Sequence, residues 1–178
     1  MTRRGVPRSG AVIDASVLVF LLHLDLLPNL VIRYDVIYVP RYVLDEVARK
    51  GRARYRLRSV LKKYSFFEKC SVSDDISVRL LSDRALNPDA RIDRGEAEAI
   101  VQARERKVGE VLIDEKKGRL IAERHSLSAH GLLGILKEFK RNGLIDEVRP
   151  LIAKLKRDLA YRIDERLLKK ELAEIGEV

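Results

Sequence analysis

Two aspartates each follow a short apolar run with the composition of a buried strand. Asp14 follows Ala11-Val-Ile13, and Asp114 follows Glu110-Val-Leu-Ile113. In an open parallel α/β sheet, ligands bind beyond the carboxyl ends of the strands, where the strand order reverses. One such aspartate alone is more simply a helix cap, but two at equivalent positions favour a shared site.

A third acid lies on the apolar side of a helix predicted over residues 95–107. At 100° per residue, Glu96 shares its face with Ala99 and Ile100, whereas Glu98 is expected on the solvated side. A carboxylate on a buried face is costly unless it is paired or binds a metal. Glu96 is therefore the candidate ligand of this helix.

Glu46 is a weaker candidate on its pattern alone. It borders the apolar stripe of Val43, Leu44 and Val47 on a helix predicted over residues 41–50. Periodicity leaves a surface position and a ligand position equally open.

Acids without histidine or cysteine partners make a hard oxygen site, which suits Mg²⁺ or Mn²⁺. Their mutual repulsion would keep some of them protonated until a cation binds. Such sites hydrolyse phosphodiesters through a metal-activated water. The single cysteine, Cys70, excludes a disulfide framework, and no spacing suggests zinc.

The charge balance favours a polyanionic partner. The chain has 36 Lys and Arg against 27 Asp and Glu, a formal net charge of +9. Charged residues make up 35% of the sequence, and Asn and Gln are scarce, as in a heat-adapted protein. Thermophily explains many charges of both signs, but not the excess of one sign.

Nine of the 36 Lys and Arg residues lie between residues 41 and 63. Phosphate contacts would offset the repulsion among these side chains, and the alternative is a solvated helix neutralised by acids elsewhere. We expect contact with phosphates of a nucleic-acid backbone rather than reading of base sequence. The predicted contact residues are Arg49, Lys50, Arg52, Arg54, Arg56 and Arg58.

Short strands alternating with helices predict a parallel sheet covered on both faces, the α/β class. Strands are expected at 11–13, 36–39 and 110–113, with Ser16 as N-cap of the first helix; 66–72 is ambiguous. Residues 1–10 are predicted to be a loose basic leader, 11–145 the α/β domain and 146–178 a helical C-terminal extension. No run reaches the roughly 18 apolar residues of a spanning helix, so we expect a soluble, cytoplasmic protein without a membrane partner.

Several motifs together resemble the PIN domain, the fold of many RNA-cleaving nucleases, including VapC-type toxins. They occur in the family's order over about residues 11–142, and the tail is similar to an extension in one largely uncharacterised subgroup. The matching segments are Val12-Ile-Asp14-Ala-Ser16, Val39-Pro40 with Leu44-Asp-Glu46-Val47, Asp93-Arg-Gly-Glu96-Ala-Glu98-Ala-Ile100, Val111-Leu-Ile-Asp114-Glu115 and Gly131-Leu-Leu-Gly134-Ile-Leu136.

The resemblance implies a three-layer α/β/α domain with Asp14, Glu46 and Glu96 as catalytic, metal-binding acids. Asp114 would be the fourth, preferred over Glu115 because it ends its strand, and Ser16 would help to order the site. It also implies Mg²⁺ or Mn²⁺, RNA cleavage leaving a 5′-phosphate and a 3′-hydroxyl, a homodimer and an antitoxin-like protein inhibitor. His130 departs from the subgroup pattern: it could contact a phosphate, but a cap or packing role is commoner.

Two rival functions stay open at this point. One is a catalytically inactive PIN-like module that binds RNA or protein, and the retained acids argue against it. The other is a different acidic α/β enzyme, such as a phosphatase or phospho-acceptor domain. Asp14-Ala-Ser16 lacks the Asp-x-Asp of one phosphatase class, and no phosphate-binding Gly-rich loop is present.

Overall fold

The computed structural model describes residues 9–49 and 51–177, without the side chain of Arg52. Most of the predicted leader, and Lys50 among the predicted RNA contacts, therefore lie outside the described residues. The chain divides into two compact units, one ending at His130 and one beginning at Gly131. α7 (Leu132–Arg141) thus belongs with the later helices, so the division comes one helix before the predicted boundary.

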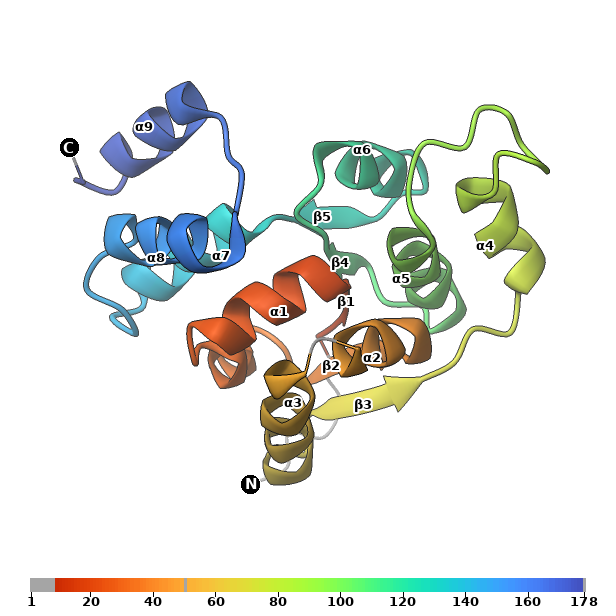
Figure 1. Cartoon of the computed structure of the whole chain (residues 1–178), viewed down its shortest axis with the longest axis horizontal. Coiled ribbons are helices and arrows are strands. Elements are labelled where there is room, and N and C mark those ends of the chain that lie inside the picture. Colours follow the sequence, from red (N-terminus) through yellow and green to blue (C-terminus); the bar gives the residue numbers. More distant parts are fainter. Residues whose placement is uncertain (1–8, 50, 178) are drawn as a thin grey trace. The chain divides into compact units, whose positions relative to one another are not determined.

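The first unit is built on a sheet of five parallel strands in the order β3-β2-β1-β4-β5. Figure 1 shows the sheet with its helices around it, in the three-layer α/β/α arrangement predicted from the sequence. The order reverses between β1 and β4, which places the switch point beside Asp14. The strands are β1 (Gly10–Ile13), β2 (Val36–Pro40), β3 (Phe67–Cys70), β4 (Glu110–Leu112) and β5 (Ser128–His130).

Predicted strands are confirmed where the sequence is apolar or β-branched. The ambiguous segment 66–72 contains β3, and β5 was not predicted because its residues are polar or only partly buried. β5 pairs in register with β4, Leu112 opposite His130.

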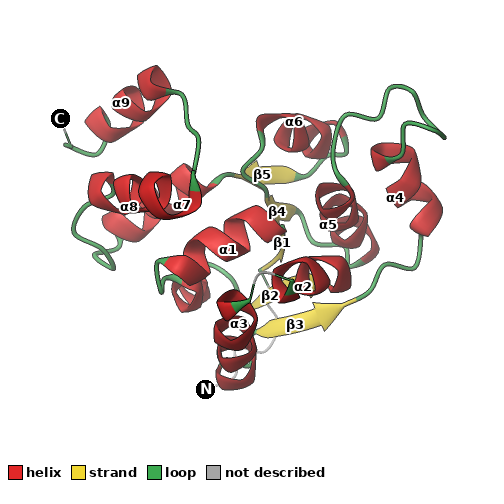
Figure 2. Cartoon of the chain, viewed as in Figure 1, coloured by secondary structure: helices red, strands yellow, loops and turns green. Residues whose placement is uncertain are grey.

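The helices of the first unit connect these strands, as Figure 2 shows in red. α5 contacts β1, β2 and β4, and α2 contacts both α1 and α5. The bounds are α1 (Ala15–His23), the 3₁₀ helix η1 (Leu27–Ile32), α2 (Arg41–Ala48), α3 (Arg52–Lys63), α4 (Asp75–Ser82), α5 (Arg94–Glu105) and α6 (Lys116–Arg124).

One face of the sheet packs on α5, which is buried along nearly its whole length. Val12, Val111 and Ile113 form a buried apolar cluster with Ala97 and Ile100 of that helix. Because strand side chains alternate between faces, Asp14 follows Val12 onto this same side of the sheet. The sheet thus directs Asp14 toward α5.

The second unit contains α7, α8 (Arg149–Leu159) and α9 (Glu165–Ala173). A buried Lys137 of α7 donates to Glu171 and, at 2.7 Å, to Glu174, which ties α7 to α9 and its C-terminal end. Glu177 accepts from Val148 N–H at 2.7 Å and Arg149 N–H at 2.8 Å, and so caps α8. In the part of the chain that the structure describes, no helix is both long and apolar enough to cross a membrane.

Candidate active site

Asp14 lies at the switch point of the sheet, directly after β1. Its N–H donates to the Leu112 carbonyl at 3.0 Å, which continues the β1–β4 pairing by one residue. Its Oδ2 accepts from Ser16 N–H at 3.2 Å and from the Ser16 hydroxyl at 2.5 Å. The predicted N-cap was wrong by two residues: Asp14 caps α1, and Ser16 is the donor that orients it.

The Asp14 carboxylate is only 5% exposed. Burial raises its pKa to about 6, and the nearby negative charge of Asp93 adds to this, although the Ser16 hydroxyl acts in the opposite direction. The charged form of Asp14 is therefore less stable in this site than in water, and a nearby cation would offset that cost.

Glu96 lies in the first turn of α5, where it forms a capping box with Asp93. Asp93 Oδ1 accepts from Glu96 N–H at 2.9 Å, and Glu96 Oε2 accepts from Asp93 N–H at 3.1 Å. Glu96 is 4% exposed, and its other oxygen, Oε1, is buried without a hydrogen-bond partner among the described residues. Buried polar atoms are nearly always paired, so this oxygen calls for a ligand or a proton.

The pKa of Glu96 is raised to about 8, first by burial and then by the charge of Asp93; Asp14 and Glu115 raise it further. Four carboxyl groups from three stretches of chain therefore interact in one place: Asp14 after β1, Asp93 and Glu96 at α5, and Glu115 before α6. Repulsion among these carboxyl groups adds to the effect of burial, although the sequence predicted it among Asp14, Glu46, Glu96 and Asp114.

Two glycines allow the backbone to come close to these acids. A β-carbon at Gly95 would lie 3.4 Å from Asp14 Oδ1 and 3.3 Å from Asp93 Oδ1. A β-carbon at Gly118 would lie 2.9 Å from the Glu96 carboxyl carbon and 2.7 Å from Ile113 Cγ2. The first turns of α5 and α6 thus form a narrow cradle around Asp14 and Glu96.

The positions of Glu46 and Asp114 can be described from their neighbours. Glu46 is half-buried on α2, one turn after Tyr42, whose ring lies 3.7 Å from the position of a Gly95 β-carbon. Tyr42 and Glu46 therefore share the face of α2 that is turned toward the cradle. Asp114 is half-buried, and its carbonyl accepts from Arg119. The neighbouring acid Glu115, which was the second choice from the sequence, is among the charges that raise the pKa of Glu96.

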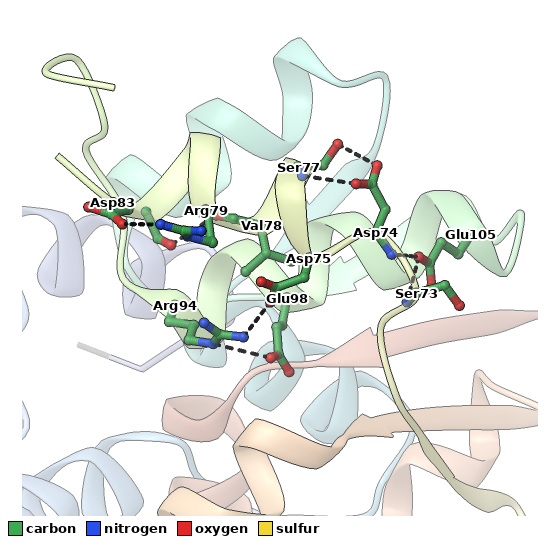
Figure 3. A network of polar contacts seen from close by, with 11 residues as sticks. Ser73, Asp74, Asp75, Ser77, Val78, Arg79, Asp83, Arg94, Glu98 and Glu105 are labelled. Atoms are coloured by element: carbon green, nitrogen blue, oxygen red, sulfur yellow. Dashed lines mark hydrogen bonds and ion pairs between the residues drawn. The ribbon is translucent and has the colours of Figure 1, made fainter. Parts of the chain in front are cut away.

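The prediction for Glu98 was wrong. Glu98 is 5% exposed, accepts a hydrogen bond from Tyr42 N–H in the first turn of α2, and lies 3.4 Å from Arg94 Nε. Arg94 also binds Asp75 of α4 at 2.6 Å, as Figure 3 shows. α2 and α4 cover the side of α5 that a one-sided amphipathic pattern assigns to solvent.

Asp93 was not among the site residues predicted from the sequence. The sequence does carry a motif there, because Asp93-Arg-Gly-Glu96 has the spacing of a capping box, with an acceptor at the N-cap and Glu three residues later. That motif identifies Asp93 as a cap, and only the fold shows that the capped turn also faces Asp14.

The predicted RNA-binding residues differ in their surroundings. Arg49, Arg54 and Arg58 are exposed, whereas Arg56 donates to Leu22 O at 2.8 Å and to Asp25 Oδ1 at 2.5 Å, tying α3 to α1. Arg56 therefore has a structural role in this fold. Lys50 and the side chain of Arg52 are outside the described part of the protein.

His130 belongs to a separate polar cluster. Its Nε2 lies 3.1 Å from Glu110 Oε2, which also accepts from Arg33 at 2.9 Å and from the Tyr34 hydroxyl at 2.8 Å. This agrees with the packing role, since the imidazole meets side chains of β4 and of the segment before β2.

A family model described as a PIN domain matches residues 10–177, nearly the whole chain. The chain belongs to the PIN-domain family. PIN domains are a nuclease superfamily whose members typically use divalent metals. No curated protein matches this PIN domain closely enough to count as a relative.

The residues of the cradle fit such a metal. Within residues 9–49 and 51–177, no three acidic, histidine or cysteine side chains already stand in a metal-holding arrangement. The donors are nevertheless all carboxylate oxygens, the ligands that Mg²⁺ and Mn²⁺ prefer. The unpaired Oε1 of Glu96 beside a second buried carboxyl is what a cation-binding site presents before the cation arrives.

Proposed function

We propose that this PIN domain is a Mg²⁺- or Mn²⁺-dependent endoribonuclease. The observation that carries the proposal is the buried, unpartnered Oε1 of Glu96 in a cradle shared with Asp14. Each carboxyl is expensive to ionise there, and a divalent cation would offset that cost for both together.

Asp14 and Glu96 would hold the ion, with Asp93 and Glu115 as neighbouring carboxylates and with Glu46 and Asp114 as the further ligands favoured by the resemblance. A bound ion would lower the pKa of a water and stabilise charge on the reacting phosphate. Ser16 keeps Asp14 Oδ2 in place, and the Asp93 N–H does the same for Glu96 Oε2. These contacts preorganise both carboxylates before any ligand binds.

RNA is the proposed substrate because of the net charge of +9 and the exposed arginines of α2 and α3. By the resemblance to toxin nucleases, the products would carry a 5′-phosphate and a 3′-hydroxyl. The same resemblance supports the proposals of a homodimer and of a small antitoxin-like protein inhibitor.

Cleavage of single-stranded and structured RNA with Mn²⁺ tests the proposal, with wild type compared with Asp14→Asn and Glu96→Gln. Losing even an outer partner of a metal ligand typically costs about 10–100-fold, so each variant should lose at least about 100-fold. Glu123→Gln, at an exposed position of α6, is the matched control and should cleave like wild type. Equal cleavage by all proteins, or by none with either metal, would contradict the proposal, and the second result would favour an inactive binding module.

A further inference from the structure

A hollow of about 580 Å³ lies between α2, α3 and β3. Its floor is aliphatic, with Leu44 and Ala48 from α2 and Leu57 and Leu61 from α3. Its volume is within the range of sites that bind small organic molecules, about 300–1,000 Å³. It is separate from the acidic cradle.

The rim of this hollow is strongly basic. Arg54, Arg58 and Lys62 follow one another at single-turn intervals along α3, and Lys69 comes from β3. None of these four side chains forms an ion pair or hydrogen bond with another described residue. The one acid of the lining, Asp45, is 59% exposed and lies 3.9 Å from Arg41. Four unneutralised cations around an apolar floor suit a ligand with an apolar body and negative charges.

The hollow is connected to the cradle by the exposed surface of α2. At 100° per residue, Leu44 and Ala48 lie on one side of α2, while Tyr42 and Glu46 lie nearly opposite. Arg41 and Arg49, both exposed, lie on the arc between them. An α-helix with its side chains is about 10–12 Å across, so a flexible polyanion a few units long can reach from one site to the other.

We infer that this hollow binds one unpaired nucleotide of the RNA substrate, with its base on the leucine floor and its phosphates on the rim cations. This rests on the proposed ribonuclease function and adds to it a nucleotide subsite outside the acidic cradle. In a duplex the base is stacked and paired, and extracting it costs a few kcal/mol. The polar side chains of the lining are Asp45 and the four rim cations, so the base itself is expected to pack on the aliphatic floor.

The charge pattern favours RNA over an acidic protein segment as the occupant. The cations do not stop at the hollow but continue along α2 through Arg41 and Arg49 toward the acidic cradle. A row of exposed cations leading from the hollow toward the proposed cleavage site, with Asp45 as the acid among them, suits a substrate strand, whereas a docked peptide requires cations only at the hollow itself.

Binding can be measured apart from cleavage by using the Asp14→Asn protein in EDTA. We expect a fluorescent single-stranded 12-mer to bind at least about tenfold more tightly than the same 12-mer in a duplex. Adding Arg58→Gln with Lys62→Gln should weaken single-strand binding. The slope of log K against log salt should then fall by about 1.4, at about 0.7 per lost phosphate contact.

Two further comparisons test whether the base contributes to binding and whether the substituted residues must line the hollow. Replacing the nucleotides of the 12-mer by abasic ones should weaken binding to the Asp14→Asn protein, and Leu61→Gln should weaken binding of the normal 12-mer but not of the abasic one. Lys63→Gln is the control on the same helix, because the Lys63 ammonium lies over the Tyr64 ring, 5.2 Å from its centroid, and does not line the hollow.

The inference is overturned if single-stranded and duplex RNA bind equally, or if the Arg58/Lys62 variant binds like the Lys63 control. It is also overturned if an acidic amphipathic peptide binds the hollow while the RNA affinities do not change with these variants. None of these results depends on catalysis. Cleavage by wild type with unchanged binding by the variants would refute the subsite alone, whereas normal binding without any cleavage would refute the proposed nuclease alone.

Discussion

Gly118 stands so close to Glu96 that a β-carbon at position 118 would lie 2.9 Å from the Glu96 carboxyl carbon. The first turn of α6 can approach the acidic cradle only because residue 118 has no side chain. The second close neighbour, Ile113 Cγ2 at 2.7 Å, belongs to the chain just after β4 and cannot yield easily. The cradle therefore depends on glycine at this position.

Gly118→Ala is expected to destabilise the fold by about 1–3 kcal/mol, because it overpacks a filled site. The measurement is urea unfolding followed by circular dichroism. Gly134→Ala is the matched control: it lies in a helix with no atom within 4 Å of its added carbon, so it should be neutral or stabilising. Equal effects of the two substitutions would contradict the close packing of α6 on Glu96.

Glu96 should make stability fall as pH rises when no divalent ion is present. Its pKa is about 8 in the fold against an ordinary 4.5, so between these values the folded state holds the proton more tightly than the unfolded state. The contribution of Glu96 to the free energy of unfolding is fully present below about pH 4.5 and is lost as the pH rises through 8. The free energy of unfolding of Glu96→Gln, relative to that of wild type, should therefore rise by at least about 1 kcal/mol between pH 5 and pH 8.5.

Urea unfolding in EDTA at these two pH values measures that difference. For Glu123→Gln, exposed on α6, the difference in free energy of unfolding from wild type should be the same at both pH values. A pH-independent offset for Glu96→Gln would mean that Glu96 ionises normally in the fold.

Glu98 joins α5 to the first turn of α2, so its removal should loosen the face that carries Glu46. Glu98→Ala leaves the Tyr42 N–H without its acceptor and Arg94 with only Asp75, a loss of about 1–3 kcal/mol. Unfolding measurements should show this loss, and hydrogen exchange should show faster exchange of the α2 amides. Glu123→Ala should remain within about 0.5 kcal/mol of wild type. A similarly neutral Glu98→Ala would show that the contacts of Glu98 do not stabilise α2.

Lys137 should hold α9 in place within the C-terminal unit. It is 7% exposed, and Lys137→Ala would remove the donor shared by Glu171 and Glu174. Breaking a buried ion pair costs about 3–5 kcal/mol when one charge is left buried, and less here because Glu174 is half exposed. Hydrogen exchange of the α9 amides should accelerate, whereas Lys169→Ala, on the exposed side of α9, should leave it unchanged.

The parts of the fold that follow from local pattern were predictable. β1, β2 and β4 are short, mostly apolar runs, and an acid follows β1 and β4 within two residues, which predicted a site at the carboxyl edge of the sheet. β5 was not predictable in this way, because Ser128 is exposed and His130 half-buried, and only pairing with β4 makes the segment a strand.

The site was predictable only in part for a related reason. Periodicity identified Glu96 as buried because its own helix sets that face. The burial of Glu98 depends on α2 and α4, which come from other parts of the chain. The contribution of Asp93 was likewise hidden, because local sequence shows a helix cap and not the neighbouring Asp14.

Calorimetric titration of Mn²⁺ into wild type and Glu96→Gln at pH 7, in buffers of different ionisation enthalpy, tests the central claim most directly. Because the pKa of Glu96 is about 8, most molecules carry its proton at this pH, and binding should release close to one proton. We predict that wild type binds Mn²⁺ with this release and that Glu96→Gln loses both the release and at least about tenfold in affinity. Equal binding by the two proteins, or no binding by wild type, would contradict a metal site at Asp14 and Glu96.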